Sequence, residues 1–157
     1  MYPLGHMALG YLSGRIVSVY TKKDFNTLII FFVSISPDID IIIPNLLHRG
    51  PTHSVILVLV FFIPIFIFYK EGIPYLVALL SHSLIGDYFT KPGCKLFWPL
   101  SNDWFIYTNA WSVRSTFGIS LEILLFVLML IVIARERYLK KYRVRMQFEK
   151  KNISGIK

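Results

Sequence analysis

Histidine and aspartate residues gather in a few short stretches of an otherwise apolar sequence. All four histidines and three of the five aspartates lie in these stretches. Imidazole and carboxylate groups without thiolates form the usual ligand set of catalytic zinc and of other hydrolytic divalent ions. Seven candidates exceed the ligands of one tetrahedral ion, which predicts either two ions or one ion with supporting partners. The candidates are His6, Asp38, Asp40, His48, His53, His82 and Asp87.

The segment HRGPTHS, residues 48 to 54, brings two imidazoles and a guanidinium together. His48 lies on a predicted loop and His53 in the first turn of the next helix, so both rings can turn toward one point. Thr52 is the candidate cap of that helix. Arg49 has the planar guanidinium that binds phosphate or carboxylate in two-point fashion. Taken alone, each histidine also fits a simple hydrogen-bonding role.

Asp38 and Asp40 follow a proline in the stretch SPDIDIII. An unpaired ionised carboxylate in an apolar membrane segment costs about 2.5 to 3.5 kcal/mol, so two of them within three residues require a cation. A metal ion would supply that charge. The alternative is that they pair with Arg49 or cap the next helical turn.

A further pair lies in SHSLIGDYFTKPG, residues 81 to 93, where His82 and Asp87 are five positions apart. Five residues turn a regular α-helix by about 500°, which leaves the two side chains about 140° apart. They share a face only if the helix bulges or ends between them. Gly86 makes such a local departure possible.

The composition of the 157-residue chain is that of a membrane protein. It is 55% hydrophobic, with a mean hydropathy of +0.57. The apolar runs at 55 to 69 and 119 to 134 reach, with their flanks, the roughly 18 to 20 residues of a bilayer span, so both are predicted to be transmembrane. The single cysteine, Cys94, excludes an intramolecular disulfide and a cysteine-based zinc cluster, and packing is its expected role.

Much of the net charge of +8 lies in the tail that follows the last apolar run. A basic segment in that place is typical of a juxtamembrane anchor to anionic lipid. Nucleic acid is not an expected partner, because the tail has no reading motif and follows a span directly. We expect a membrane-embedded domain over residues 1 to 140 and a basic cytoplasmic tail over residues 141 to 157.

Prolines, glycines and charges divide the chain into helical segments. The expected helices cover residues 3 to 20, 24 to 36, 53 to 70, 73 to 90 and 116 to 140. The second is too short to cross a bilayer alone and ends before Pro37, because the residue preceding a proline is pushed out of the helical region. The predicted fold is an all-α integral membrane bundle of about five helices, one of them short.

The positive-inside rule predicts the orientation of the bundle. If the helices alternate and the basic tail is cytoplasmic, Lys22, Lys23 and Lys70 also lie inside. The outer side then receives the amino terminus, the connection at 37 to 52 and the loop at 91 to 115, whose three tryptophans suit the headgroup level. The histidines and aspartates of the candidate set converge near this outer face.

Several motifs together resemble a known family, the small membrane-bound metal-dependent hydrolases described in bacteria as LexA-regulated inner-membrane hydrolases. The motifs are PDID at 37 to 40, HRGPTHS at 48 to 54, SHSLIGDYFTKPG at 81 to 93 and LFWPLS at 96 to 101, with His6 near the start. The resemblance covers roughly residues 1 to 120. It implies a multi-helix membrane fold with a divalent metal site, distantly similar to zinc-dependent phospholipase C.

The resemblance also implies a role for each candidate residue. Asp40 is expected to be a ligand or a base, and zinc is the expected metal, as one or two ions. The family usually shows H-x-x-x-D where this chain has HSLIGD, one residue longer. Either the helix bulges there, or Asp87 is not a direct ligand. The expected ligands are His6, Asp38, His48, His53, His82 and Asp87.

The leading interpretation is a phosphoester hydrolase that acts on a phospholipid or another lipid-linked or membrane-proximal substrate. Metal binding would lower the pKa of a coordinated water to about 7, with Asp40 as the base and either a second metal ion or Arg49 offsetting the developing charge. Lys91 and Lys95 would face the lipid headgroup. Two alternatives remain: a metal-binding or ion-transporting membrane protein without chemistry, and a structural clamp between the second and third helices.

Overall fold

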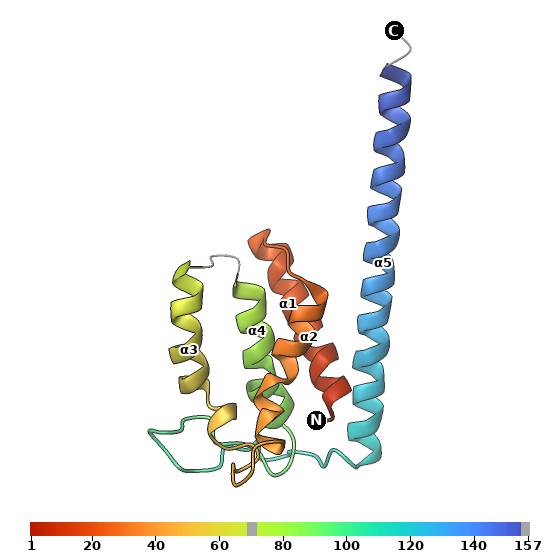
Figure 1. Ribbon diagram of the computed structural model, residues 1–157. Helices are drawn as coiled ribbons and strands as arrows, with labels where there is room; N and C mark the ends of the chain where they lie inside the picture. The colour runs from red at the N-terminus through yellow and green to blue at the C-terminus, as the bar shows by residue number, and fades with distance from the viewer. Residues whose placement is uncertain (69–71, 155–157) are drawn as a thin grey trace.

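The computed structural model describes residues 1–68 and 72–154, and it is built from α-helices (Figure 1). No β-strand occurs among these residues, apart from two isolated bridges in the loop region. The five helices are α1 (Pro3–Thr21), α2 (Thr27–Ile35), α3 (Val55–Phe68), α4 (Ile73–Ser81) and α5 (Thr116–Ser154). Three short segments of other helical geometry are η1 (Ser36–Ile41), η2 (Pro51–His53) and η3 (His82–Asp87). The predicted all-α bundle is confirmed.

The helices alternate in direction, as predicted. Figure 1 shows the amino terminus, η1, η2, η3 and the connection between η3 and α5 at one end of the bundle, and the end of α5 on the opposite side. The polar segments that carry the candidate residues therefore gather at one end. The orientation of this end relative to the membrane stays a prediction.

Several helix boundaries differ from the predicted ones. α3 begins at Val55, and its cap is Ser54, whose Oγ accepts the N–H groups of Ile56 and Leu57 at 3.2 and 3.3 Å. Thr52 is therefore not the cap, because a separate turn of 3₁₀ helix precedes α3. α5 does not end near 140 but continues to Ser154. The predicted end of the third helix at Lys70 lies outside the described residues.

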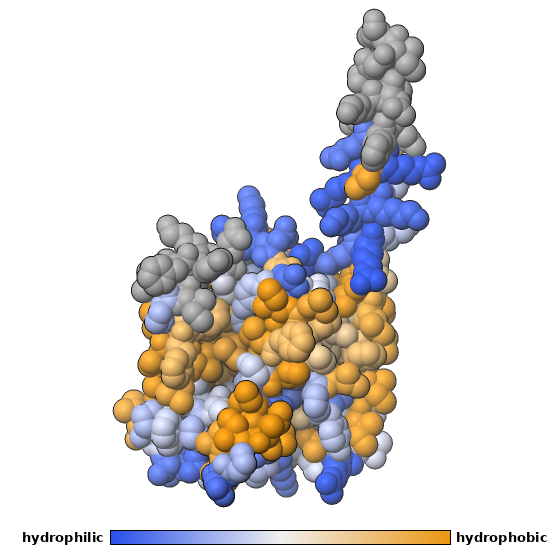
Figure 2. Space-filling view, viewed as in Figure 1, coloured by the Kyte–Doolittle hydropathy of each residue, from blue (hydrophilic) through white to orange (hydrophobic). Residues whose placement is uncertain are grey.

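On the face shown in Figure 2, hydrophobic side chains form a band across the bundle between two more hydrophilic ends. In the part of the chain that the structure describes, only Thr116–Gln147 is long and apolar enough to cross a bilayer by itself. α3 has 14 residues and is about 21 Å long at 1.5 Å per residue, shorter than a full span. The predicted span at 55 to 69 is therefore seen as a 14-residue apolar helix up to Phe68, and its extent beyond this residue lies outside the described residues.

α1 lies at the centre of the fold and contacts α2, α4 and α5. Its buried residues Ala8 and Tyr11 pack with Ile30 of α2, Ala78 of α4 and Met129 of α5. Polar contacts at the start and in the middle of α1 add to this packing. The Tyr2 N–H donates to Glu122 at 2.9 Å, and the Tyr11 hydroxyl donates to Glu136 at 3.0 Å. The long α5 is thereby fixed to the small bundle.

Gly10 allows α2 to approach α1 closely. A Cβ atom at this position would lie 1.9 Å from the Ser34 Oγ and 2.6 Å from its Cβ. Ser34 is fully buried, so its side chain has no space to move into. The Ser34 carbonyl also contacts His82, which makes this helix contact important for the polar end of the bundle.

We expect Gly10→Ala to destabilise the protein by about 1 to 3 kcal/mol, because the added methyl group overpacks the contact between α1 and α2. Thermal unfolding in detergent would measure the loss. Val19→Ile is the matched control, since it also adds one methyl group but at a side chain that is 65% exposed. Equal stability of the two variants would contradict the close contact.

Candidate metal centre

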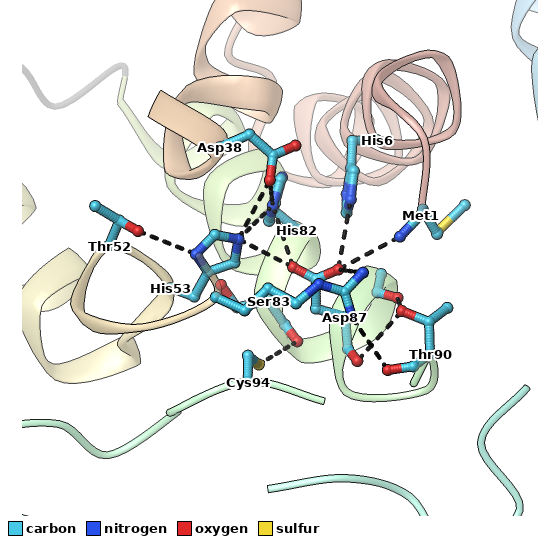
Figure 3. Close-up of polar contacts among 12 residues, drawn as sticks. Met1, His6, Asp38, Thr52, His53, His82, Ser83, Asp87, Thr90 and Cys94 are labelled. Atoms are coloured by element: carbon cyan, nitrogen blue, oxygen red, sulfur yellow. Dashed lines mark hydrogen bonds and ion pairs between the residues drawn. The ribbon is translucent and has the colours of Figure 1, made fainter. Parts of the chain in front are cut away.

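Four side chains from three segments converge at the polar end of the bundle (Figure 3). Asp38 comes from η1, His53 from η2, and His82 and Asp87 from η3. One ligand atom from each residue lies within 4.8 Å of all the others. Three of these residues are buried, and Asp38 is partly exposed. We call Asp38, His53, His82 and Asp87 the tetrad.

The separations within the tetrad fit a tetrahedral ion. Ligands at 2.0 to 2.1 Å from a tetrahedral zinc lie about 3.3 Å from one another. The His53 Nε2 lies 3.1 Å from the His82 Nε2, 3.1 Å from the Asp87 Oδ2 and 3.4 Å from the Asp38 Oδ1. The His82 Nε2 lies 3.3 Å from the Asp87 Oδ2 and 3.5 Å from the Asp38 Oδ1. Five of the six edges therefore have the expected length.

The imidazole of His53 is held by groups on its Nδ1 side. The Asp40 Oδ2 lies 3.2 Å from this nitrogen, and the Thr52 Oγ1 lies 3.1 Å from it. Because a carboxylate only accepts hydrogen bonds, this contact favours the tautomer with the proton on Nδ1. The Nε2 lone pair of the neutral ring then faces the tetrad. A carboxylate behind a ligating histidine is a common arrangement in metal sites.

The imidazole of His82 is oriented in the same way by a backbone group. Its Nδ1 lies 2.6 Å from the Ser34 carbonyl oxygen at the end of α2. A carbonyl can only accept, so Nδ1 carries the proton and Nε2 faces the tetrad. A side-chain pattern in the sequence cannot reveal this contact, because its acceptor is the main chain of a distant helix.

The five-residue spacing between His82 and Asp87 is accommodated by π-helical geometry. The segment η3 continues α4, and the Tyr88 N–H donates to the Ser83 carbonyl at 3.0 Å, a bond between residues i and i+5. Such bulges insert one residue into an α-helix and often occur at functional sites. Both side chains consequently point to the same place, which is the outcome expected if the helix bulges.

Arg49 contacts Asp87 instead of lying open to an anion. Its Nη2 is 2.9 Å from the Asp87 Oδ1, and its Nη1 donates to the carbonyl groups of Thr90 and Lys91 at 3.2 Å. The residue is only 6% exposed. In the structure the guanidinium neutralises a ligand candidate and fixes the start of the following loop, and the role of Arg49 as an anion clamp stays a prediction.

Asp40 is also occupied by hydrogen bonds. Its Oδ2 accepts the Arg49 backbone N–H at 2.9 Å and the Thr52 hydroxyl at 2.7 Å, while its Oδ1 lies 2.9 Å from the His48 Nδ1. Because Asp40 contacts these groups and His53, its geometry favours orienting the His53 ring over acting as a general base. Asp40, His48 and His53 form a second group of potential ligands. Its atoms are already joined by hydrogen bonds, which favours a single ion in the tetrad.

His6 lies beside the tetrad but outside the group of four. Its ring stacks on His82 with the centroids 3.6 Å apart and an interplanar angle of 12°. Its Nε2 is 3.6 Å from the Asp87 Oδ1. Gly86 makes this stacking possible, since a Cβ there would lie 2.5 Å from the His6 Cε1. The direct ligand role predicted for His6 therefore remains a prediction.

Unpartnered atoms support the binding of a cation at this place. Among the described residues, both ring nitrogens of His6 and the Oδ2 of Asp87 are buried without a hydrogen-bond partner. Buried polar atoms nearly always have a partner. The Asp87 Oδ2 lies close to two imidazoles but is hydrogen-bonded to neither, as expected for atoms that face a common point. The residues therefore fit a divalent ion.

The protonated imidazole of His53 balances the negative charge of the neighbouring carboxylates. Burial disfavours the charged form of His53, but the neighbouring carboxylates of Asp38, Asp40 and Asp87 outweigh this effect and raise its pKa to about 10. Burial alone would raise the pKa of Asp40, yet its bonds from His53, His48 and Thr52 lower it to about 2. A cation that enters the tetrad must therefore displace a proton.

Deletion of Ile85 tests the role of the bulge. It leaves the histidine and the aspartate four positions apart, a spacing at which they share a face of a regular α-helix. Ile85 is 46% exposed, so few contacts are lost. We expect metal binding within about tenfold of the wild type, measured by titration with zinc. Insertion of an alanine after Ile85 should abolish binding, and equal behaviour of the two variants would contradict the bulge.

Metal affinity should also depend on pH. Because the raised pKa keeps His53 protonated up to about pH 10, binding below that pH releases its proton. Burial also disfavours the charged form of His82, but Asp38 and Asp87 outweigh it and raise the pKa of this second imidazole. The apparent affinity for zinc should then rise at least about tenfold for each pH unit between pH 6 and 8. Calorimetry in two buffers of different ionisation enthalpy would count the released protons. A pH-independent affinity would refute the assignment of His53 as a ligand.

Comparison of the whole sequence with known proteins identifies its family. The sequence model of the YdjM inner membrane protein family matches residues 1–148, so the chain belongs to this family. No curated protein and no solved structure matches the sequence. Family membership and the long apolar helix together place the protein in a membrane. The resemblance to hydrolases and to phospholipase C stays a prediction.

Proposed function

We propose that this member of the YdjM inner membrane protein family is a metal-dependent hydrolase of phosphoesters in lipids or in other membrane-proximal substrates. The observation that carries the proposal is the tetrad, whose ligand atoms have the separations of a tetrahedral ion. Imidazole and carboxylate ligands without thiolates are typical of catalytic zinc, and zinc is the proposed ion.

Each residue of the site has a proposed task. His53, His82, Asp38 and Asp87 hold the ion, which when bound lowers the pKa of water and offsets charge on a phosphoester. Asp40 and Thr52 orient His53, and the Ser34 carbonyl orients His82. Arg49 neutralises Asp87 and keeps the adjoining loop in place. None of these tasks requires Arg49 to contact the substrate.

The side chain of Asp38 indicates where a substrate approaches. It is 16% exposed, whereas those of His53, His82 and Asp87 are between 0% and 1% exposed. Among the four tetrad residues the side of η1 is thus the most open, and a substrate group is proposed to reach the site there. A carboxylate at the opening can also yield a coordination position, which a catalytic site needs and a closed structural site does not.

The proposed orientation places this site at the outer face of the membrane. The second half of α5 is rich in basic residues, and the tail is proposed to be cytoplasmic by the positive-inside rule. The site lies at the opposite end of the bundle (Figures 1 and 2). The substrate would then be a lipid or lipid-linked molecule of the outer leaflet.

A structural metal site is a second candidate function. Four protein ligands from three separate segments would join η1, η2 and η3, and a closed set of four is typical of structural zinc. An ion-transport role has less support, because the tetrad lies at one end of the bundle and not along a polar path through it. The two candidates differ in whether metal-loaded protein turns over a substrate.

The matched variants His53→Gln and His48→Gln test the proposal. His53→Gln should reduce bound zinc and the hydrolysis of a chromogenic phosphodiester to background, because a ligand of the tetrad is lost. The ring of His48 is 45% exposed; it is hydrogen-bonded to Asp40 and packs edge-to-face against His53, with the centroids 5.6 Å apart, but it is not a member of the tetrad. His48→Gln should therefore retain the metal, with affinity reduced at most about 10-fold to 100-fold. Metal content and hydrolysis are measured on protein purified in detergent.

Thermal unfolding in the presence of zinc provides the control for these variants. Wild-type protein that folds without binding metal would refute the proposal. Stoichiometric metal without turnover of phospholipid or phosphodiester, together with a large loss of stability in His53→Gln, would favour the structural site. Uptake of zinc into vesicles that contain the protein would favour transport.

A further inference from the structure

An apolar groove begins beside the tetrad and runs along α3. It has a volume of about 300 Å³, which is at the lower end of the range of small-molecule sites. The lining residues come from η1, η2, α3 and α4. They are Ser36, Pro37, Thr52, Leu57, Val58, Phe61, Phe62 and Leu79. All the lining side chains from α3 and α4 are apolar, and the two hydroxyl groups belong to the segments next to the tetrad.

The polar end of the groove is continuous with the metal centre. Thr52 lines the groove, donates to Asp40 and lies 3.1 Å from the His53 Nδ1. Pro37 lines it as well and directly precedes Asp38, the most exposed member of the tetrad. A molecule in the groove would therefore have one end at the side from which a substrate can reach the tetrad.

The other part of the groove lies within the apolar band of the protein. Figure 2 shows hydrophobic residues around the bundle at the level of α3, and Phe61, which lines the groove, is 70% exposed. In a membrane this surface contacts lipid chains, so an acyl chain can enter sideways without crossing water. A hydrophilic ligand would gain no hydrogen bonds along Leu57, Val58 and Phe62.

The charges around the polar end suit a phosphate group. The loop after η3 carries Lys91 and Lys95, and its main chain is bonded to Arg49, which joins it to the tetrad. The Lys91 carbonyl accepts from the Arg49 guanidinium at 3.2 Å, and the Lys95 N–H donates to the Arg49 carbonyl at 3.0 Å. Two lysines thus lie on the segment beside the site: Lys91 is exposed, and the Lys95 ammonium donates to the Asn102 side chain at 3.1 Å.

We propose that the groove is the acyl-chain subsite for a phospholipid that enters laterally from the bilayer, with its phosphate at the tetrad. This inference rests on the proposed hydrolase function and names its substrate class. The apolar lining binds the chain, and the position of Thr52 and Pro37 places the phosphodiester next to Asp38. A phosphoester without a long chain would bind the tetrad but not the groove.

Photolabelling tests the groove without depending on hydrolysis. The full-length protein is placed in nanodiscs of phosphatidylcholine and phosphatidylglycerol that contain a phosphatidylglycerol with a diazirine in one acyl chain. After irradiation, we expect mass spectrometry to find the label enriched at Leu57, Phe61 and Leu79 relative to apolar positions of α5. Even labelling of all apolar surfaces, or a cross-link from the groove to a second copy of the chain, would overturn the proposal.

Groove-filling variants give the second readout. Leu57→Trp and Leu79→Trp should each reduce labelling of the groove at least fivefold and reduce hydrolysis of long-chain phosphatidylglycerol similarly. Zinc content and hydrolysis of a soluble chromogenic phosphodiester should remain within twofold of the wild type. Val60→Trp, at a residue of α3 that is 57% exposed and does not line the groove, is the matched control.

The outcomes separate the two proposals. If the soluble diester is hydrolysed but the Trp variants leave the long-chain lipid unaffected, the groove proposal fails and the hydrolase stands. If no ester is hydrolysed but the label marks the groove and Leu57→Trp removes it, the hydrolase proposal fails and lipid binding stands. If photolabelling of the groove is unchanged in both Leu57→Trp and Leu79→Trp, the groove proposal fails, whether or not an ester is hydrolysed.

Discussion

The buried carboxylate of Asp87 is the group on which the polar end of the protein depends. Its two oxygens have different neighbours. Oδ2 faces the imidazoles of His53 and His82, while Oδ1 lies 2.9 Å from the Arg49 guanidinium and 3.6 Å from His6. An ionised group that is removed from water needs such compensation, because burial without a partner is costly. The surrounding segments are therefore arranged to bring positive or metal-binding groups to this residue.

The π-helical turn shows how backbone geometry serves the same centre. A regular helix would place His82 and Asp87 about 140° apart, and one of them would then face lipid. The i to i+5 bond between Ser83 and Tyr88 absorbs the additional residue and keeps both side chains inward. Gly86 serves the same turn, since its lack of a side chain leaves space for the ring of His6. The π-helical turn and the close packing of His6 against Gly86 thus involve the same face of η3.

Particular residues show the limits of prediction from the pattern alone. The predicted alternation of the helices correctly placed the histidines and aspartates at one end of the bundle, because each polar segment follows or precedes an apolar helix. The pattern could not assign partners within that end. Arg49 has the chemistry of an anion clamp but contacts Asp87, and Asp40 resembles a base but orients His53. Thr52 looked like a helix cap, but the cap is Ser54 and Thr52 connects Asp40 to the apolar groove.

The sequence by itself determined the helical class, the membrane environment and the set of residues available to bind a metal, because hydropathy and residue chemistry are properties of local segments. Only the tertiary structure decided which four side chains form the tetrad, which way their rings face and where the groove opens. Ligand geometry depends on distances of a few ångströms between segments far apart in the chain. The Ser34 carbonyl that orients His82 lies 48 residues away from it. Such contacts follow from helix packing, to which every residue of the bundle contributes.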